Sequence, residues 1–417
     1  MARKAIKRSG PPRFPEHPEE EHDWRLQRAR KIMEEDGLDA LLLGRNVNVF
    51  YATGSRFVFV GMDAPVALAP QSVAIITKDA DIYCQRFGPF DSDEVPEHTT
   101  WSGSLEMYDD ELEILNILSD YAISEGARIG TEWGPGNCVG INPLKFQVLQ
   151  DELLKKLRAE VVDAASTVSK IMSVKSNVEI ERMTKAVKAA ARAMERVYDV
   201  IKIGMSEVEL AQMTSRFMME EGADALSHAQ VMAEGDGQMR FLSCNALDRP
   251  IEKGWVHLDL GCRYRRYMSD INRGVFLGRQ PTAEEERLYA CRLGVSELMD
   301  KLIRPGLAID DLLEEVDRYI ERQGYRLRKI GGAAFVGHSL GLEPYQKPNL
   351  IPSEFQPEFT SSTGKVLLEP GMVFTYEMAI ETPVEMPFFN IEDNVVVTDS
   401  GVENMNAELS RELRVIA

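Results

Sequence analysis

The segment Trp255-Val-His-Leu-Asp-Leu-Gly-Cys-Arg-Tyr-Arg-Arg-Tyr-Met-Ser-Asp-Ile-Asn-Arg273 carries two aspartates, Asp259 and Asp270, inside apolar, strand-like runs. A hairpin with a two-residue turn at Tyr264-Arg265 places these aspartates directly opposite each other. Neither turn residue favours a positive φ, so a longer loop of even length is an equal alternative. Opposed side chains have Cβ atoms about 4.5–5.5 Å apart, and like charges there repel. A shared proton, a basic partner or a metal must offset that repulsion.

The same arrangement recurs nearer the C-terminus. Glu377 ends the run Met372–Glu377 and Glu392 lies in the run Asn390–Val395, so a second hairpin opposes two glutamates. Between the two pairs lies His338, in an apolar segment flanked by glycines. This oxygen-rich set with one imidazole suits two divalent cations, which sit roughly 3.5–4 Å apart and need bridging carboxylates. It favours Mn, Fe, Co or Zn over Ca or Mg. The alternative for each acidic residue alone is a solvated strand position.

The composition is that of a globular protein with an acidic surface. The chain has 417 residues, with 67 Asp+Glu against 48 Lys+Arg, a formal net charge of −19 and 44% hydrophobic residues. This length implies two or three domains. The negative charge argues against nucleic acid or a membrane surface as a partner, because both are polyanionic and would repel the protein.

Targeting and redox signals indicate a cytoplasmic location. No apolar core follows the basic run Ala2–Arg8, so the start of the chain does not resemble a signal peptide. No apolar run is long enough to span a bilayer. The five cysteines are scattered, odd in number and without a CxxC pair, which argues against a disulfide framework and favours a reducing compartment.

Alternating helical and strand-like patterns predict an α/β domain at residues 24–174, after a polar, proline-containing tail at residues 1–23 that we expect to be flexible. The expected helices of this domain lie at residues 24–37, 109–125 and 144–158. Its expected strands lie at residues 40–43, 72–76, 80–84 and 128–131.

From residue 175 onward, long helices flank strands, which predicts a separate α+β domain at residues 175–417. Ser176 or Asn177 caps the first helix, and Ser206 opens the second with the capping-box form S-x-x-E. The expected helices lie at residues 178–203, 206–221, 283–303 and 309–323, and the expected strands at 256–262, 267–276, 373–380 and 390–397.

At its acidic motifs the chain resembles the pita-bread metallohydrolase family, which includes prolidase, aminopeptidase P, methionine aminopeptidase and creatinase. The similar stretches follow the family's order and spacing: Asp259-Leu-Gly, Ser269-Asp270-Ile-Asn-Arg273, Gly337-His338-Ser-Leu-Gly341, Leu368–Glu377 and Ile391–Thr398. Asn48–Gly54 also looks like part of the N-terminal domain of the creatinase and prolidase branch. The resemblance implies a pita-bread catalytic domain preceded by that α/β domain.

The resemblance also implies a role for each acidic residue. Asp259 would chelate one of two divalent ions, and Asp270 and Glu392 would bridge both. His338 and Glu377 would complete the second. Members of this branch usually dimerise, so we expect a homodimer.

Two substrate-facing histidines of the family's peptidases are absent. Tyr345 stands seven residues after the metal histidine, where one of them belongs, and Leu242-Ser-Cys-Asn245 stands in the region of the other. Those histidines bind the scissile carbonyl and the tetrahedral intermediate, so their absence argues against ordinary dipeptide cleavage. The dimethylsulfoniopropionate lyase of the same fold is altered at these histidines too, but its aspartate six residues after the metal histidine is Pro344 here.

Three further residues are candidates for the site. Tyr345 can donate a hydrogen bond in place of the missing imidazole, although a phenol with a pKa about 10 is a poor base at neutral pH. His257 shares a strand face with Asp259, so it is either a hydrogen-bond partner behind the metal ligands or a partly exposed strand residue. His228 is expected first as a loop residue and second as a pocket residue.

The sequence therefore predicts a dinuclear-metal hydrolase that cleaves an amide bond of a small substrate, with a proline-containing dipeptide as the leading class. The ions activate water and polarise a carbonyl, and Glu377 accepts the proton. A metal-dependent lyase and a creatinase-like C–N hydrolase are the alternatives. A catalytically silent binding module is the third, and the intact five-ligand set argues against it.

Overall fold

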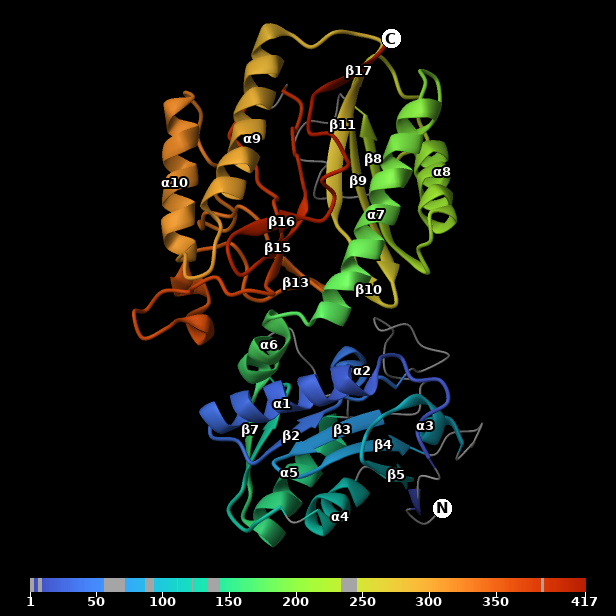
Figure 1. Cartoon of the computed structure of the whole chain (residues 1–417), viewed down its shortest axis with the longest axis vertical. Coiled ribbons are helices and arrows are strands. Elements are labelled where there is room, and N and C mark those ends of the chain that lie inside the picture. The colour runs from blue at the N-terminus through green and yellow to red at the C-terminus, as the bar shows by residue number, and fades with distance from the viewer. Residues whose placement is uncertain are drawn as a thin grey trace. The chain divides into compact units, whose positions relative to one another are not determined.

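A computed structural model describes residues 4–6, 10–55, 72–86, 94–110, 112–121, 123–133, 143–233, 246–383 and 386–417 of the chain (Figure 1). The chain divides into two compact units, Met1–Met172 and Ser173–Ala417. In the described residues, no helix combines the length and the apolar character needed to cross a membrane.

The first unit is built on a mixed seven-stranded sheet. Its strand order is β1-β5-β4-β3-β2-β6-β7, with β2 parallel to β6 and antiparallel to β3. The strands are β1 (Lys4–Ile6), β2 (Ala40–Leu43), β3 (Ser72–Thr77), β4 (Asp81–Arg86), β5 (Ser104–Tyr108), β6 (Arg128–Thr131) and β7 (Glu160–Asp163). The central strands are buried apolar runs, as expected for a sheet covered on both faces.

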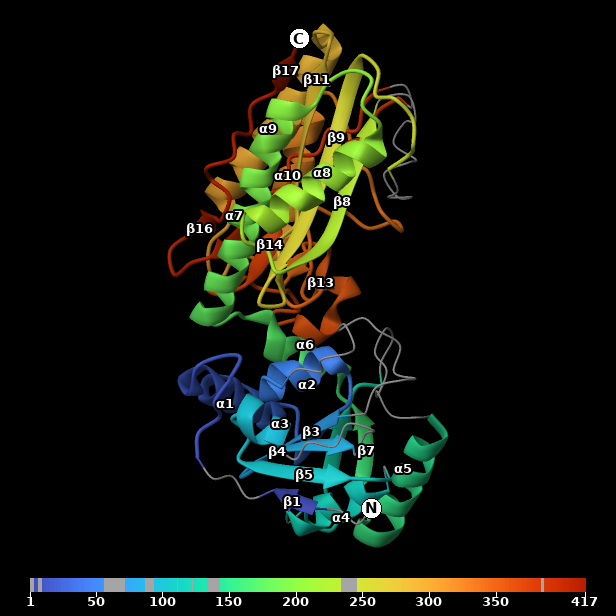
Figure 2. The same cartoon turned by 90° about the vertical axis from the view of Figure 1, so that its right-hand side faces the viewer.

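Helices lie on both faces of this sheet (Figure 2). On one face, α4 (Glu113–Asp120) and α5 (Pro143–Leu157) form a core with the alternate residues of β2, β3 and β4. On the other, α1 (Glu19–Glu35) and α2 (Asn46–Thr53) pack against β3. The short helix α3 (Glu94–Thr99) and α6 (Ala165–Ser173) complete the unit.

The expected N-terminal tail is more ordered than its composition indicates. Strand β1 pairs with β5, and α1 begins at Glu19 rather than near residue 24. The backbone of Phe14 donates to the His98 carbonyl, and Trp101 Nε1 donates to the His17 carbonyl. The polar residues of this segment are therefore held by the unit itself, a contact that composition does not reveal.

The second unit contains two five-stranded sheets, each backed by a pair of helices (Figure 1). The first sheet has the order β10-β9-β11-β17, with β8 also paired to β9. Helix α7 contacts β9 and helix α8 contacts β8. The elements are α7 (Asn177–Val200), α8 (Glu207–Glu220), β8 (Ala225–Ala233), β9 (Gly254–Tyr264), β10 (Tyr267–Met268), β11 (Ile271–Leu277) and β17 (Arg414–Ile416).

The other sheet of this unit has the order β13-β12-β14-β15-β16 and shares its apolar core with α9 and α10. Its elements are α9 (Ala283–Leu302), α10 (Ile309–Arg322), β12 (Ser339–Leu340), β13 (Pro344–Gln346), η3 (Ser353–Phe355), η4 (Pro357–Phe359), β14 (Val373–Thr375), β15 (Asn394–Val397) and β16 (Val402–Asn404). An antiparallel bridge between Asn272 and Glu392 joins the two sheets. The candidate site lies at this junction.

Helix caps fix where the first two helices of this unit begin. Ser176 accepts a hydrogen bond from the Glu179 backbone while the Glu179 side chain returns one to Ser176, which is a complete capping box. Ser206 accepts from the Glu209 backbone. Of the two caps expected for the first helix, Ser176 and Asn177, the structure has Ser176, and Ser206 caps the second helix as expected.

Candidate metal centre

The hairpin that carries the two aspartates differs from the expected one by one turn position. Tyr264 pairs with Tyr267, so the turn is Arg265-Arg266, and both arginines have positive φ, 49° and 73°. The Arg265 backbone donates to Asp224 Oδ2 at 2.6 Å, which supports this turn. As a result Asp259 pairs with Asn272 rather than with Asp270. The predicted direct opposition is wrong, and the two carboxylates are diagonal neighbours on one face.

The second pair has the register that the sequence indicates. Val373 pairs with Val396 and Thr375 with Asn394, and the backbone of Tyr376 donates to the Asp393 carbonyl at 3.0 Å. Continued by one further step, this register places Glu377 opposite Glu392. The ladder ends at Thr375 and not at residue 380, because the following connection leaves the sheet.

His338 enters the same space from the segment before β12. A Cβ at Gly337 would lie 1.9 Å from the Thr375 carbonyl oxygen, so only glycine allows this close approach. His338 Nδ1 donates to the Ser339 carbonyl at 3.1 Å, which leaves Nε2 as the free lone pair. Nε2 lies 3.7 Å from Asp270 Oδ2, 3.6 Å from Glu377 Oε2 and 3.7 Å from Glu392 Oε1.

A second imidazole belongs to His228, which the sequence predicted first as a loop residue and second as a pocket residue. This residue lies on β8 rather than in a loop. Its Nε2 is 2.9 Å from Asp259 Oδ1 and 3.2 Å from Asp270 Oδ1. The donor atoms therefore form two groups, His228 with Asp259 and Asp270, and Asp270 with His338 and Glu392. Asp270 is common to both.

Burial and mutual repulsion shift the protonation of the carboxylates. Burial, together with the charges of Asp270 and Asp259, raises the pKa of Glu377 to about 8. Burial and the charges of Asp270 and Glu377 raise the pKa of Glu392 well above its usual value. Burial also raises the pKa of Asp259, but the charge and hydrogen bond of His228 outweigh it and leave that pKa below its usual value. The site is thus short of positive charge.

The two histidines respond in opposite ways. Burial lowers the pKa of His228, but the charges of Asp270 and Asp259 outweigh burial and hold it well above its usual value. At His338 burial dominates and lowers the pKa, despite the charge of Asp270. His338 is therefore poised as a neutral ligand, whereas His228 carries a proton that a cation would have to displace.

His257 is buried behind the cluster, not partly exposed. Its Nε2 accepts a hydrogen bond from Asn272 Nδ2 at 2.7 Å, and its ring lies against that of Phe388, with centroids 5.4 Å apart. Asn272 also hydrogen-bonds Asp259. Burial lowers the pKa of His257 to about 4, so it is neutral at pH 7 and positions Asp259 through Asn272.

Tyr345 lies over His338, with ring centroids 4.1 Å apart. It has a φ of +55° and is 57% exposed, so the phenol lies at the edge of the cluster. Burial and the charges of Glu377 and Asp270 raise the pKa of Tyr345 above its usual value. The group is a hydrogen-bond donor at neutral pH and cannot serve as a base.

Arg292 on α9 ties the two glutamate-bearing segments together. Its Nη2 donates to the Tyr376 carbonyl at 2.8 Å and to the Ile391 carbonyl at 2.7 Å. These carbonyls immediately precede Glu377 and Glu392 in the chain. Burial lowers the pKa of Arg292 to about 10, yet the residue remains cationic at pH 7 and offsets part of the negative charge of the site.

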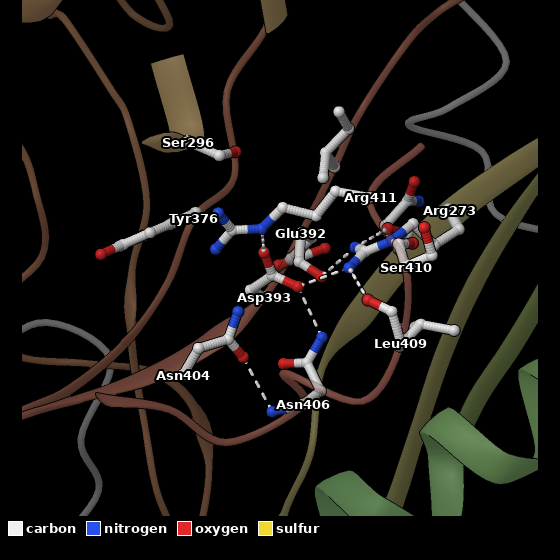
Figure 3. Close-up of polar contacts among 12 residues, drawn as sticks. Arg273, Ser296, Tyr376, Glu392, Asp393, Asn404, Asn406, Leu409, Ser410 and Arg411 are labelled. Atoms are coloured by element: carbon white, nitrogen blue, oxygen red, sulfur yellow. Dashed lines mark hydrogen bonds and ion pairs between the residues drawn. The ribbon is translucent and has the colours of Figure 1, made fainter. Parts of the chain in front are cut away.

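A network around Asp393 holds Glu392 from the other side (Figure 3). Arg273 Nη2 donates to Asp393 Oδ1 at 2.6 Å, and its Nη1 donates to the Glu392 carbonyl at 2.9 Å. Arg411 Nε donates to Asp393 Oδ2 at 2.6 Å, and Asn406 Nδ2 donates to Oδ1 at 2.5 Å. This buried network fixes the backbone from which Glu392 projects.

The donor set fits divalent cations. Four carboxylates and two imidazoles converge from both sheets, and they are largely buried. Among the described residues, Glu392 Oε1 is buried without a hydrogen-bond partner. Buried carboxylates that lack donors are costly unless a cation compensates them.

Sequence reasoning assigned five residues of this cluster and gave His228 a place in the pocket only as a second choice. It missed Asn272, Arg273 and Arg292, which complete the cluster. The only sequence signal for His228 is the alternation of His228, Gln230 and Met232 along one strand face. Asn272, Arg273 and Arg292 act through backbone or buried contacts. The segment Leu242–Asn245, where a histidine of the family's peptidases is expected to be missing, lies outside the described residues.

Known families match both parts of the chain. The family described as Metallopeptidase family M24 matches residues 181–399. The Creatinase/Prolidase N-terminal domain matches residues 25–174.

Individual relatives cover nearly the whole chain. It is 29% identical over 387 residues to "Uncharacterized peptidase YqhT" of Bacillus subtilis, covering 90% of this chain and 96% of that protein. It is 25% identical over 400 residues to the Xaa-Pro dipeptidase of Pyrococcus furiosus, covering 93% and 99%. The prolidase structure from Pyrococcus horikoshii has the same fold, with a TM-score of 0.71, 24% identity and coverage of 94% and 99%.

Proposed function

Because the chain belongs to metallopeptidase family M24, as its acidic motifs indicate, we propose that it is a dinuclear-metal hydrolase that cleaves an amide bond of a small substrate. The observation that carries this proposal is the convergence of Asp259, Asp270, His338, Glu377 and Glu392 within one buried cluster.

The proposed assignment follows the two groups of donor atoms. Asp259 would hold the first ion, His338 and Glu377 would hold the second, and Asp270 and Glu392 would be shared between them. Divalent ions bound here supply Lewis-acid activation of water and of the substrate carbonyl. Glu377, whose Oε2 lies 3.6 Å from His338 Nε2, would accept the proton of the attacking water. His257 orients Asp259 through Asn272.

A dipeptide with C-terminal proline is the first substrate class to test. Its support is the Pyrococcus furiosus relative named Xaa-Pro dipeptidase. In this proposal Tyr345 is a hydrogen-bond donor to the substrate. Its exposed phenol lies beside His338 and donates to the substrate carbonyl oxygen, on which negative charge develops. Replacement of Tyr345 by Phe therefore lowers kcat more than it raises KM.

One observation favours a second candidate. Tyr345 is a protonated phenol where the family's peptidases place an imidazole, so proton transfer to a leaving amine has one fewer route. A metal-dependent lyase, or a C–N hydrolase acting on a small zwitterion, needs no such imidazole. The products distinguish the two, since a lyase releases an alkene and adds no water.

The test begins with metal content and ends with turnover. We expect about two equivalents of Mn, Co, Fe or Zn per chain after loading, and loss of metal in Asp270→Asn. Loaded enzyme is then assayed on Gly-Pro and Ala-Pro and on small zwitterionic amides and sulfonium compounds. Metal uptake below one equivalent overturns the dinuclear site. Turnover of a zwitterion to an alkene, with no dipeptide cleaved, overturns the hydrolase.

Manganese as the native ion, a homodimer and a cytoplasmic location remain proposals. In support of a reducing compartment, the buried residues Cys84, Cys262 and Cys291 carry thiols rather than disulfides. Sedimentation of the loaded protein tests the dimer, and a monomer at micromolar concentration would contradict it.

A further inference from the structure

Strand β8 contains a bulge next to the candidate metal centre. Leu226 pairs with Cys262, whereas His228 pairs with Gly261, so Ser227 is an extra residue in the ladder. Bulges bend a strand and redirect its side chains, and they are frequent beside active sites. After the bulge, Gln230 pairs with Asp259, which puts His228 on the same face of the sheet as Asp259.

The partner strand leaves room for this imidazole. A Cβ at Gly261 would lie 2.3 Å from Cε1 and 2.6 Å from Nδ1 of His228. Any side chain at residue 261 would therefore occupy the space that the imidazole ring takes. Glycine inside a strand weakens that strand, and it often marks a position where another group approaches closely. At Gly261 of β9 that group is the imidazole of His228.

The ring presents one nitrogen to the centre and the other to its own strand. Nε2 lies 2.9 Å from Asp259 Oδ1 and 3.2 Å from Asp270 Oδ1. Nδ1 lies 3.4 Å from Ser227 Oγ, the hydroxyl of the bulged residue. A metal-binding histidine has this arrangement, since its second nitrogen is held by a neighbouring acceptor that fixes the ring.

We infer that His228 is a sixth protein ligand of the centre, giving the ion beside Asp259 an imidazole of its own. This inference rests on the proposed function, because it concerns the same site. Each sheet then supplies one imidazole, His228 from β8 and His338 from the segment before β12. Imidazole suits Co and Zn better than it suits Mn. The imidazole therefore raises the affinity of the first ion position for Co and Zn more than its affinity for Mn.

The experiment counts imidazoles directly on the full chain. Wild type, His228→Phe and His228→Gln are loaded with Co²⁺ and examined by X-ray absorption, which reports the mean number of imidazoles per ion. Wild type gives one imidazole per ion, and both variants give one per two ions. Glutamine retains an oxygen donor, so His228→Gln binds the ion more tightly than His228→Phe.

Affinity provides an independent readout. Calorimetric titration of the apoprotein shows a weaker first site in His228→Phe, by at least about tenfold for Co²⁺ and Zn²⁺ and by less for Mn²⁺. His98→Gln, in the first unit, is the matched histidine control and leaves both readouts unchanged. Circular dichroism verifies folding, and if His228→Phe does not fold, His228→Gln carries the test through its imidazole count.

The outcomes separate the two proposals. If wild type binds no Co²⁺, the proposed function fails. If wild type binds two ions with one imidazole per ion and a His228 variant retains that number and the wild-type affinities, the function stands and the sixth ligand is overturned. A wild-type value of one imidazole per two ions also overturns the assignment of His228 as a ligand.

Discussion

Arg292 donates a hydrogen bond of 2.7 Å to the carbonyl oxygen of Ile391, the residue before Glu392. The same Nη2 atom reaches Tyr376, the residue before Glu377. One helix side chain thus holds the backbone beside two metal-facing carboxylates.

Replacing Arg292 by Met should destabilise the second unit and weaken metal binding. Each buried carbonyl left without a donor costs about 1–3 kcal/mol, so we expect a loss of about 3 kcal/mol in the free energy of unfolding. Denaturant unfolding of the metal-free protein measures this loss. Arg287→Met is the control on the same helix, because Arg287 is exposed and should change stability by less than about 0.5 kcal/mol. Equal effects of the two substitutions would contradict the role of Arg292 in holding the backbone beside Glu377 and Glu392.

Among replacements of a charged residue near the site by an uncharged one, Asp393→Asn should lower the stability of the protein most. It leaves Arg273 buried without its carboxylate, and breaking a buried ion pair costs about 3–5 kcal/mol. Thermal unfolding should show a correspondingly lower Tm, with weaker metal binding through the displaced Glu392 backbone. Asp399→Asn, at an exposed turn in the same segment, should leave both unchanged. A wild-type Tm in Asp393→Asn would show that the network contributes little.

Metal binding should release protons at pH 7. In the metal-free protein the pKa of His228 is held above its usual value and that of Glu377 lies near about 8, so these groups carry protons that a cation displaces. Affinity should therefore rise with pH between about 6 and 8. Titration calorimetry in buffers of different ionisation enthalpy measures the release. An enthalpy independent of buffer would contradict the assigned protonation.

The first unit should lose stability as pH rises towards 7, because of Glu132. This buried carboxyl accepts hydrogen bonds from the backbones of Gly44 and Arg45 and from Asn48, but burial outweighs them and raises its pKa to about 7. The folded state thus binds the proton more tightly than the unfolded state. The stabilisation is complete below about pH 4.5 and is lost as pH rises through about 7, for a total of about 3 kcal/mol.

Glu132→Gln should remove that pH dependence. The thermal transition of the first unit, followed by calorimetry from pH 5 to 8, should become flat in the variant. Glu160→Gln, an exposed position on β7, should retain the wild-type slope. A slope that persists in Glu132→Gln would assign the pH dependence to another group.

Periodicity was sufficient to predict the long elements. Strands β2 and β6 have the bounds that their apolar runs predicted, and the capping serines placed α7 and α8. The spacing of Glu377 and Glu392 predicted the register in which β14 pairs with β15, and this ladder ends at Thr375, before Glu377.

Features set by a single backbone angle or by distant contacts were not predictable. The Asp259 register depended on whether two arginines adopt a positive φ, a choice that Asp224 decides from another element. His228 was expected first in a loop because a bulge places it, and bulges leave no periodic signal. Arg292 reaches backbone carbonyls 84 and 99 residues away, and no local pattern encodes such contacts.

The bridge between Asn272 and Glu392 has reciprocal hydrogen bonds of 3.3 and 3.1 Å, and it is where the two sheets meet. Ions bound by ligands from both sheets would link the two sheets at this bridge. The two halves of the second unit would then unfold together rather than separately. The amides of these two residues should then exchange with solvent only through opening of the whole unit. In the ion-free protein they would become the first place where the halves separate.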